Sequence, residues 1–377
     1  MKKRKLTAAL LAGILAFSMA GCGNSGSTQT DITKDEAKST GEGQNVGENQ
    51  SSKADITEKI PLKISHHPYI HALPSIYAEK NGLYDAFDYT IDYYASGPVQ
   101  NEAAASDSWE VGTTGIGGAI LGSVGYDMKV IAATCSETNT NDLWVRADSP
   151  LAKAGKGEHG IYGSAQDWKG LKILCQTGTV CHLTLIATLD SLGLKESDVE
   201  IVDTAVAQSY AAFKAGQADV VALWSPFGFE AEKEGWVKVS SASAVGLELP
   251  CLVVATEKAV NERPEVVQQW LEAYLKAADG LETDQDASAV MLYNFEEEQG
   301  IVMSEESAKR EIETRPFPTL EQNKEYFKDN GDSSKMEDIL LRFTDFMIEQ
   351  GKLSEADKEA MLDKGFVDGS FIEKVSY

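Results

Sequence analysis

The residues that decide the fold begin with Pro61-Leu-Lys-Ile-Ser65, and His66-His67-Pro68 follows directly. The first stretch alternates apolar and polar residues as a half-buried strand does, and residues 73–80 predict a helix. Further strands are predicted at residues 88–94 and 129–134, with a small, apolar run between them. Strand and helix therefore alternate, a pattern typical of a parallel, doubly wound sheet.

A second series of the same kind follows the first. Its strands are predicted at residues 171–175, 199–202, 220–224 and 236–239, and its helices at 180–191 and 208–215. The chain should leave the first unit near residues 142–146 and return near 250–255. We therefore expect an α/β fold with two doubly wound lobes, a two-strand hinge and a ligand cleft between them. The predicted divisions are lobe 1 at 59–143 and 250–377, the latter with C-terminal helices, and lobe 2 at 144–249.

The N-terminus has the pattern of an exported lipoprotein. Four basic residues at positions 2–5 precede 16 residues without charge, a run shorter than a membrane span and typical of a signal peptide. The run ends in Ser18-Met19-Ala20-Gly21-Cys22, which resembles the bacterial lipobox. We expect residues 1–21 to be removed and Cys22 to be lipidated, which would anchor the protein outside the bacterial cell membrane. The alternative is an ordinary cleaved signal with an incidental cysteine.

Residues 22–58 predict a flexible linker, because they contain almost no large apolar residue that could offset the entropy of ordering. Removal of the signal takes away four of the 34 basic residues and none of the 59 acidic ones, so the formal charge changes from −25 to −29. A charge this negative argues against nucleic-acid binding, which needs a basic face. At 377 residues, with 42% hydrophobic residues, the chain is long enough for two packed units.

Several ordered motifs resemble one known family. They include Ile76-Tyr-Ala-Glu-Lys-Asn-Gly-Leu-Tyr84, Val111-Gly-Thr-Thr-Gly115, Asp167-Trp-Lys-Gly-Leu-Lys-Ile173, Ala212-Phe-Lys-Ala-Gly-Gln-Ala-Asp219 and Gly365-Phe-Val-Asp-Gly-Ser-Phe-Ile372. In this order and spacing, the chain resembles the substrate-binding lipoproteins of nitrate, sulfonate (taurine-type) and bicarbonate ABC importers, which are grouped with thiamine-precursor-binding proteins. The resemblance covers residues 60–372.

The resemblance implies a periplasmic-binding-protein type II fold and no catalysis. It implies a protein that captures a small molecule and passes it to a membrane permease driven by a separate ATPase. We expect a monomer without a cofactor. The chain has no Walker A motif of its own, so a partner would handle ATP.

Three strand-end loops of the first lobe are predicted to face the cleft. They hold His66, His67 and Pro68, then Ser96 and Gly97, and finally Thr113 and Thr114. Hydroxyl groups and glycines allow backbone N–H groups to approach a ligand closely. The alternative for each loop is a tight strand–helix turn.

In the second lobe, Gly178 and Thr179 form a turn that opens a helix, with His182 one turn later. The free N–H groups and the positive dipole end of such a helix favour an anion. Thr179 has the alternative role of an N-cap. Trp224 ends a strand directly before Ser225-Pro226, where its indole would form a wall of the cleft, or it is a core residue.

His67 and His71 lie four residues apart, but no further metal ligands follow at a suitable spacing, and we expect no metal. Spacing leaves open whether disulfides form among Cys135, Cys175, Cys181 and Cys251. Three other functions remain: an exported enzyme that reuses the fold, a sensory or adhesion lipoprotein, and an importer protein for a thiamine-precursor pyrimidine. The histidine loop and Trp224 favour an organic ligand over bare nitrate.

Overall fold

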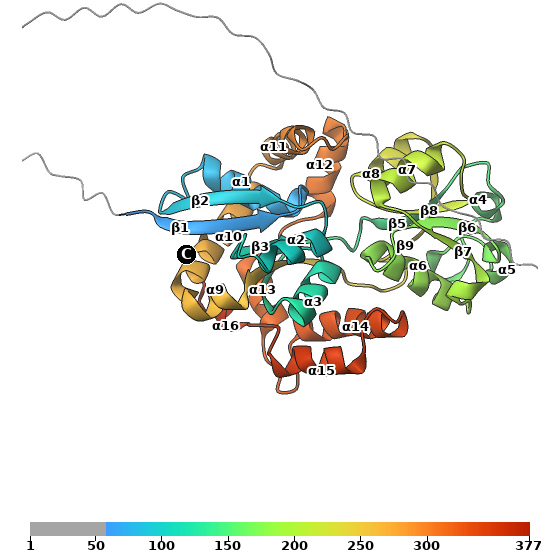
Figure 1. The fold of residues 1–377 in the computed structure, drawn as a ribbon. Helices are drawn as coiled ribbons and strands as arrows, with labels where there is room; N and C mark the ends of the chain where they lie inside the picture. Colours follow the sequence, from blue (N-terminus) through green and yellow to red (C-terminus); the bar gives the residue numbers. More distant parts are fainter. Residues whose placement is uncertain (1–57) are drawn as a thin grey trace, which may run out of the picture. The chain divides into compact units, whose positions relative to one another are not determined.

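The computed structural model describes residues 58–377, and the predicted signal peptide, Cys22 and the linker through residue 57 lie outside them. Its first sheet has the strand order β2-β1-β3-β10-β4, of which β1, β2 and β3 are labelled in Figure 1. The strands are β1 (Ile60–His66), β2 (Phe87–Tyr93), β3 (Val111–Thr114), β4 (Met128–Ser136) and β10 (Pro250–Thr256). β1 pairs in parallel with β2 and β3, whereas β10 runs antiparallel to β3 and β4.

The second sheet has the order β7-β6-β8-β5-β9. Its strands are β5 (Asn141–Val145), β6 (Lys172–Cys175), β7 (Glu200–Asp203), β8 (Val220–Trp224) and β9 (Val237–Ser241). β6 is parallel to β7 and β8, and β5 is antiparallel to β8 and β9. Both sheets belong to one compact unit of the chain. Residues 137–140 lead from β4 to β5, and residues 242–249 lead from β9 back to β10.

Helices connect the strands and build the C-terminal part. Within the two sheets they are α1 (Leu73–Lys80), α2 (Gly97–Ala104), α3 (Ile116–Gly125), α4 (Pro150–Ala154), α5 (Ala165–Trp168), α6 (Val180–Ser191), α7 (Val206–Lys214) and α8 (Phe227–Lys233), with short 3-10 turns η1 (Ile70–Ala72), η2 (Glu158–Gly160) and η3 (Glu196–Asp198). After β10 come α9 (Glu257–Glu262), α10 (Pro264–Glu282), α11 (Gln285–Glu298), α12 (Glu305–Thr314), α13 (Leu320–Phe327), α14 (Lys335–Glu349), α15 (Glu355–Asp363) and α16 (Ser370–Lys374).

The predicted helices at 73–80 and 180–191 and the predicted strand at 220–224 are confirmed residue for residue as α1, α6 and β8. Two expectations need correction. The sheets are mixed rather than wholly parallel, because a strand that arrives from the other lobe enters its sheet in the opposite direction. The segment expected to cross between the lobes is β5, which pairs with β8 and β9 along its length. The predicted boundary at residues 143 and 144 therefore falls inside a strand of the second sheet, and the crossing is residues 137–140.

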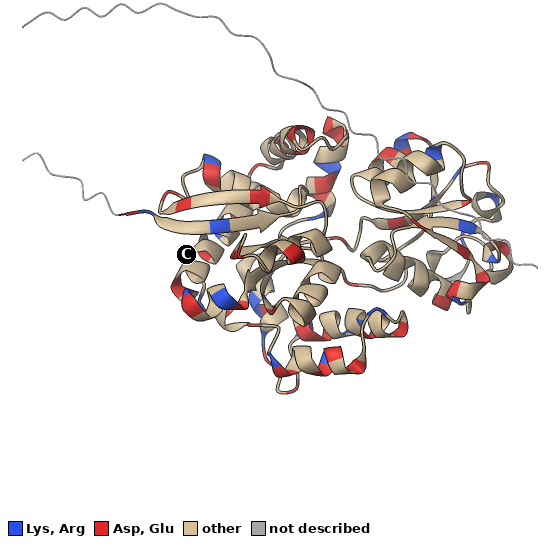
Figure 2. Cartoon of the chain, in the orientation of Figure 1, with Lys and Arg blue, Asp and Glu red and all other residues tan. Residues whose placement is uncertain are grey.

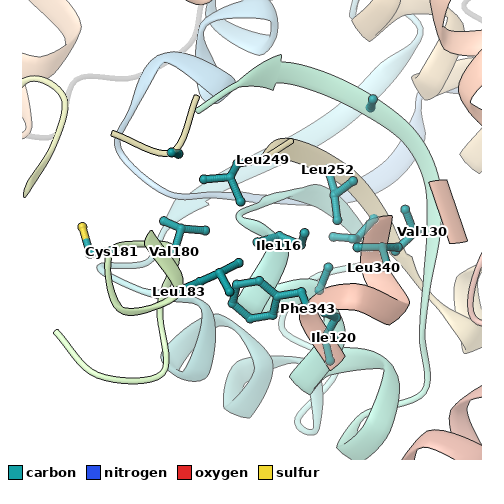
Figure 3. Packing of buried hydrophobic residues seen from close by; sticks show 14 of the residues in the cluster. Ile116, Ile120, Val130, Val180, Cys181, Leu183, Leu249, Leu252, Leu340 and Phe343 are labelled. Carbon is teal, nitrogen blue, oxygen red and sulfur yellow. The ribbon is translucent and has the colours of Figure 1, made fainter. Parts of the chain in front are cut away.

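The apolar core continues from one sheet to the other. Ile116 of α3, Leu183 of α6 and Phe343 of α14 belong to one cluster and are shown together in Figure 3. Leu249 of the return crossing joins them. The ring of Phe346 on α14 also meets the ring of His182 on α6, with centroids 5.6 Å apart. The C-terminal helix α14 therefore packs against both lobes beside the space between them.

The acidic excess is carried largely on helix surfaces, and acidic residues recur along α14 and α15 (Figure 2). Ser334 and Ser354 form capping boxes with the acidic residues Glu337 and Asp357 at the starts of these two helices, where a negative charge also complements the helix dipole. Among residues 58–377, no helix combines the length and the apolar character that crossing a membrane requires.

Candidate functional site

A cavity of about 350 Å³ opens between the two sheets. It is lined by the loops that follow β1, β2, β3, β6 and β8 and by Glu137 of the first crossing. Residues of the C-terminal segment, which comprises residues 257–377 after β10, complete the lining. The carboxyl ends of the parallel strands of both sheets meet here, which is where open α/β sheets bind their ligands. The strand order therefore accounts for the place of the cavity.

Three helices start at this cavity, and their N-terminal residues line it. Ser96 is the N-cap of α2, Gly115 of α3 and Thr179 of α6, and none of the three makes a side-chain capping hydrogen bond. The Thr179 hydroxyl instead donates to the carbonyl of Gln176 (2.7 Å). The first N–H groups of a helix have no partner within it, so these N–H groups are available to acceptor atoms of a ligand.

Small residues allow α2 and α3 to converge. A Cβ atom added to Gly97 would lie 2.6 Å from the Cα of Gly118, and a Cβ atom on Gly118 would collide with the Thr114 hydroxyl. Any larger side chain at either position would push the two helix starts apart. The glycines therefore fix the geometry of the lobe 1 side of the cavity.

A buried chain of hydrogen bonds supports the floor of this side. The His66 ring bonds the Thr113 hydroxyl through Nδ1 (2.6 Å) and the Ser75 hydroxyl through Nε2 (2.8 Å). Thr113 also bonds His71 Nδ1 (2.8 Å), and Ser75 bonds the Tyr84 hydroxyl (2.8 Å). We call His66, His71, Thr113, Ser75 and Tyr84 the histidine network. Its polar groups satisfy one another, as burial requires.

The histidines of this region are held in their neutral form. Burial, with a smaller contribution from neighbouring imidazoles, lowers the pKa of His66 to about 3 and the pKa of His71 well below its usual value. Burial lowers the pKa of His67 to about 4. Its ring meets that of His71 edge to face, with centroids 5.3 Å apart. At neutral pH, His67 and His71 therefore present imidazole nitrogens rather than positive charges to the cavity.

The structure divides the predicted site residues into two groups. Six of them line the cavity: His67, Ser96, Gly97, Gly178, Thr179 and Trp224. His66 and Thr113 lie beneath it in the histidine network, and the Thr114 hydroxyl is buried against His67 Nε2 (3.4 Å). Pro68 is outside the lining. Ligand contact by any of these residues stays a prediction.

His182 also lies behind the cavity wall. Its Nδ1 accepts a hydrogen bond from the Gly178 N–H (3.2 Å), so its Nε2–H points toward Glu196 Oε1 (3.3 Å). Burial lowers the pKa of His182 despite the raising effect of Glu196. The neutral ring thereby holds the turn that precedes α6. We assign it the position of a support rather than a lining group.

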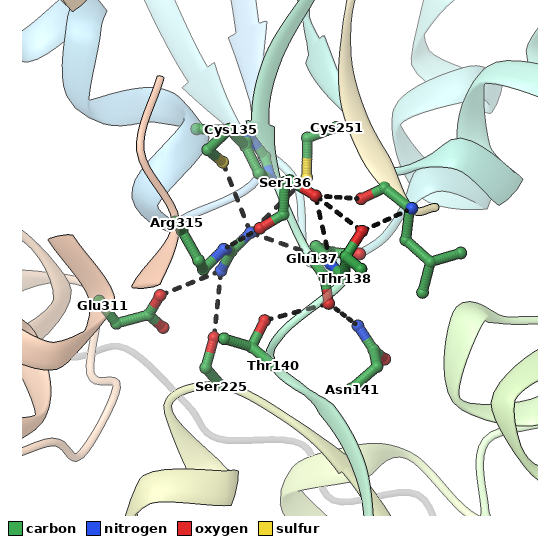
Figure 4. Close-up of polar contacts among 12 residues, drawn as sticks. Cys135, Ser136, Glu137, Thr138, Thr140, Asn141, Ser225, Cys251, Glu311 and Arg315 are labelled. Carbon is green, nitrogen blue, oxygen red and sulfur yellow. Dashed lines mark hydrogen bonds and ion pairs between the residues drawn. The ribbon is translucent and has the colours of Figure 1, made fainter. Parts of the chain in front are cut away.

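Arg315, whose polar contacts Figure 4 shows, lines the cavity but was not among the predicted residues. It follows α12 and its side chain is 2% exposed. It donates to the Ser136 carbonyl (3.2 Å), the Ser225 hydroxyl (3.2 Å) and Glu311 Oε2 (3.1 Å), and Glu137 Oε1 lies 3.4 Å away. We call Arg315 and these four partners the arginine network. It ties the C-terminal segment and the first crossing to a loop of lobe 2.

Sequence reasoning missed further lining residues from two sources. Tyr69, His71 and Gln176 lie in the same strand-end loops as the predicted residues, and a wider window around each loop would have included them. Met347 and Lys352 belong to α14 and the turn after it. No local signal connects them with strand-end loops that lie more than 120 residues earlier in the chain.

Within residues 58–377, no group of three or more His, Cys, Asp or Glu side chains is arranged to hold a metal ion. The four cysteines of this part of the chain are free and buried. Burial raises the pKa of the Cys175 and Cys181 thiols. In Cys251 the hydrogen bond with Cys135 and burial together raise the pKa of the thiol.

Comparison with known proteins agrees with this architecture. The model of the NMT1-like family matches residues 55–293. The chain belongs to the NMT1-like family. A Brachyspira hyodysenteriae protein assigned as an ABC transporter periplasmic binding protein is 30% identical over 330 residues, which are 86% of this chain and 91% of that protein. An Escherichia coli protein assigned as an aliphatic sulfonates-binding protein is 27% identical over 147 residues, 39% of this chain and 43% of that one.

Among solved structures, the periplasmic aliphatic sulphonate binding protein SsuA of Escherichia coli superposes with a TM-score of 0.64 at 19% identity. The match covers 78% of this chain and 93% of SsuA. The predicted periplasmic-binding-protein fold and the resemblance to substrate-binding proteins of ABC importers are thereby confirmed. This NMT1-like protein is a relative of extracytoplasmic solute-binding proteins.

Proposed function

We propose that the protein is the solute-binding component of an ABC importer and that its solute is a small organic anion of the sulfonate class. The observation that carries the proposal is the cavity between the lobes, into which α2, α3 and α6 open with uncapped N-termini. Helix N-termini stabilise a negative group through their N–H donors and their dipoles. The sulfonate-binding relatives reported above support this class.

The remaining lining residues suit the carbon skeleton of an organic solute. Trp224, Ile116, Leu121 and Met347 supply apolar and aromatic surface, and the neutral rings of His67 and His71 supply imidazole nitrogens. A volume of about 350 Å³ falls within the range of small-molecule sites. Bare nitrate would leave most of this surface without a partner, which favours a solute with a carbon skeleton.

We propose that Cys22 carries lipid that anchors the protein outside the cell membrane, and that the protein acts as a monomer on a permease and its ATPase. Genes for both partners beside this one would separate an importer from a sensory or adhesion lipoprotein.

We also propose that the cleft is not catalytic. His66 and His71 are engaged with Thr113, and the described cysteines lie outside the cavity lining. A nucleophile with an adjacent free base, which acyl or group transfer requires, has no counterpart in this lining.

A thermal-shift panel tests the proposal, with alkanesulfonates, nitrate, bicarbonate, pyrimidines and amino acids as probes. A ligand at 100 times its Kd stabilises the folded state by ~2.7 kcal/mol, which raises the melting temperature by about 5 °C. We expect this rise with one or more alkanesulfonates. A rise with a pyrimidine alone would replace the sulfonate assignment by the thiamine-precursor alternative, and no rise with any probe would contradict the solute-binding assignment.

A further inference from the structure

Two cationic side chains line the cavity, and they differ in whether their N–H donors are free to bind a ligand. Arg315 follows α12 and Lys352 follows α14. Both belong to the C-terminal segment, outside residues 55–293 that the family model matches. A receptor for an anionic group needs N–H donors and positive charge that the protein itself has not already used.

Arg315 has used its donors. A guanidinium has five N–H groups, and those of Arg315 have six acceptors within the protein. The acceptors are the Ser136 carbonyl, Ser225 Oγ, Glu311 Oε2, Glu137 Oε1 and the sulfur atoms of Cys135 (3.5 Å) and Cys251 (3.6 Å). The Glu311 side chain is 1% exposed, so its charge offsets that of Arg315 without screening by water.

Lys352 is in the opposite situation. It lies in an exposed turn fixed by a hydrogen bond from its own N–H to the Met347 carbonyl (2.9 Å), and Met347 lines the cavity beside it. In the part of the chain that the structure describes, its ammonium group forms no ion pair, whereas Lys335 at the start of α14 and Lys358 of α15 do. Its charge contributes to the lowered pKa of His182, the residue that accepts from Gly178 in the turn before α6.

We infer that Lys352 supplies the positive charge for the anionic group of the solute, together with the free N–H groups at the start of α6, and that Arg315 is a positioning residue that does not bind the anion. The inference rests on the proposed function and assigns this role to a residue of the C-terminal segment. Lys352 thus sets the preference of the cleft for a charged over a neutral head group.

Calorimetric titration of 1-hexanesulfonate into the purified protein tests this assignment. Lys352→Gln should weaken binding about tenfold, which corresponds to ~1.4 kcal/mol, while Lys352→Arg should stay within about threefold of the wild type. Lys276→Gln is the matched control, because it removes the same charge from an exposed position of α10 outside the cavity lining. It should leave the affinity unchanged.

The salt dependence of binding distinguishes an electrostatic role of Lys352 from a purely structural one. Between ~50 and ~500 mM NaCl the wild-type affinity should fall, since ions screen an exposed charge, and Lys352→Gln should show a flatter dependence. An affinity of Lys352→Gln within twofold of the wild type, or equal salt dependence of the two proteins, would overturn the inference and leave the proposed function standing. Absence of binding by the wild type at both salt concentrations would instead contradict the sulfonate assignment.

Discussion

The histidine network and the arginine network flank the same cavity but are built on different physics. The histidine network joins neutral rings and hydroxyl groups inside lobe 1. The arginine network holds a buried guanidinium against Glu311 and Glu137, and it connects segments as distant as Ser136, Ser225 and Arg315. The histidine network depends on its imidazoles staying neutral. The arginine network depends on opposite charges staying paired.

Because of this difference, each network should fail under a different challenge. Acid should disturb the neutral network, because burial lowers the pKa values of its histidines. Loss of one partner should disturb the charged network, because it leaves the remaining charges buried and unpaired.

Arg315→Met should lower the free energy of unfolding by about 3–5 kcal/mol, because Glu311 and Glu137 lose their buried cationic partner. Urea denaturation at pH 7.5 measures the change. Arg310→Met on α12, the helix that Arg315 follows, is the matched control, since its partly exposed pair with Glu232 should contribute at most about 1 kcal/mol. Equal effects of the two substitutions would contradict the account of the arginine network.

Acid should destabilise the protein through His66. Its pKa is about 3 in the folded state and 6.5 in the unfolded state, so the unfolded chain binds the proton first as the pH falls below 6.5. At pH 5 this costs ~2 kcal/mol of stability relative to pH 7.5. His66→Gln should reduce the loss between these two pH values by that amount in urea denaturation.

His159→Gln is the control for this pH effect, because His159 is exposed and lies outside the network. It should leave the pH dependence of the unfolding free energy as it is in the wild type. An unchanged pH dependence in His66→Gln would mean that burial in the histidine network does not keep His66 neutral in the folded protein.

Ser225→Ala should have the smallest effect, about 1.5 kcal/mol, because it removes one hydrogen bond between lobe 2 and a charged group. The loss should disappear when Arg315 is already replaced by Met, which a double-mutant cycle measures. Ser243→Ala, at an exposed position of the return crossing, serves as the control. Additive effects of Ser225→Ala and Arg315→Met would show that the two side chains do not act together.

The sequence predicted the parts of the site that follow strands. His67, Ser96, Gly178 and Trp224 end or follow strands, and the carboxyl ends of strands meet at the cavity. The same rule placed Thr113 too near the ligand, because it is the penultimate residue of a strand buried on both faces and bonds to histidines below the floor. Strand-end position alone therefore does not separate a lining residue from a support.

Arg315 and Lys352 show where sequence reasoning ends. Each follows an ordinary amphipathic helix, and only tertiary packing of α12 and α14 against the lobes brings it to the cavity. The antiparallel direction of β5 and β10 was missed for a related reason, since strand direction depends on which lobe the chain comes from. Long-range packing decides both, and local patterns do not encode it.

Hydrogen–deuterium exchange with and without 1-hexanesulfonate is the decisive measurement, because it reports on the backbone N–H groups proposed to hold the solute. We expect bound sulfonate to slow exchange at the starts of α2, α3 and α6, which are residues 95–99, 115–118 and 177–181. Exchange at all three should slow over the same range of sulfonate concentration. Unchanged exchange at all three helix starts in the presence of bound sulfonate would contradict the proposed role of these N–H groups.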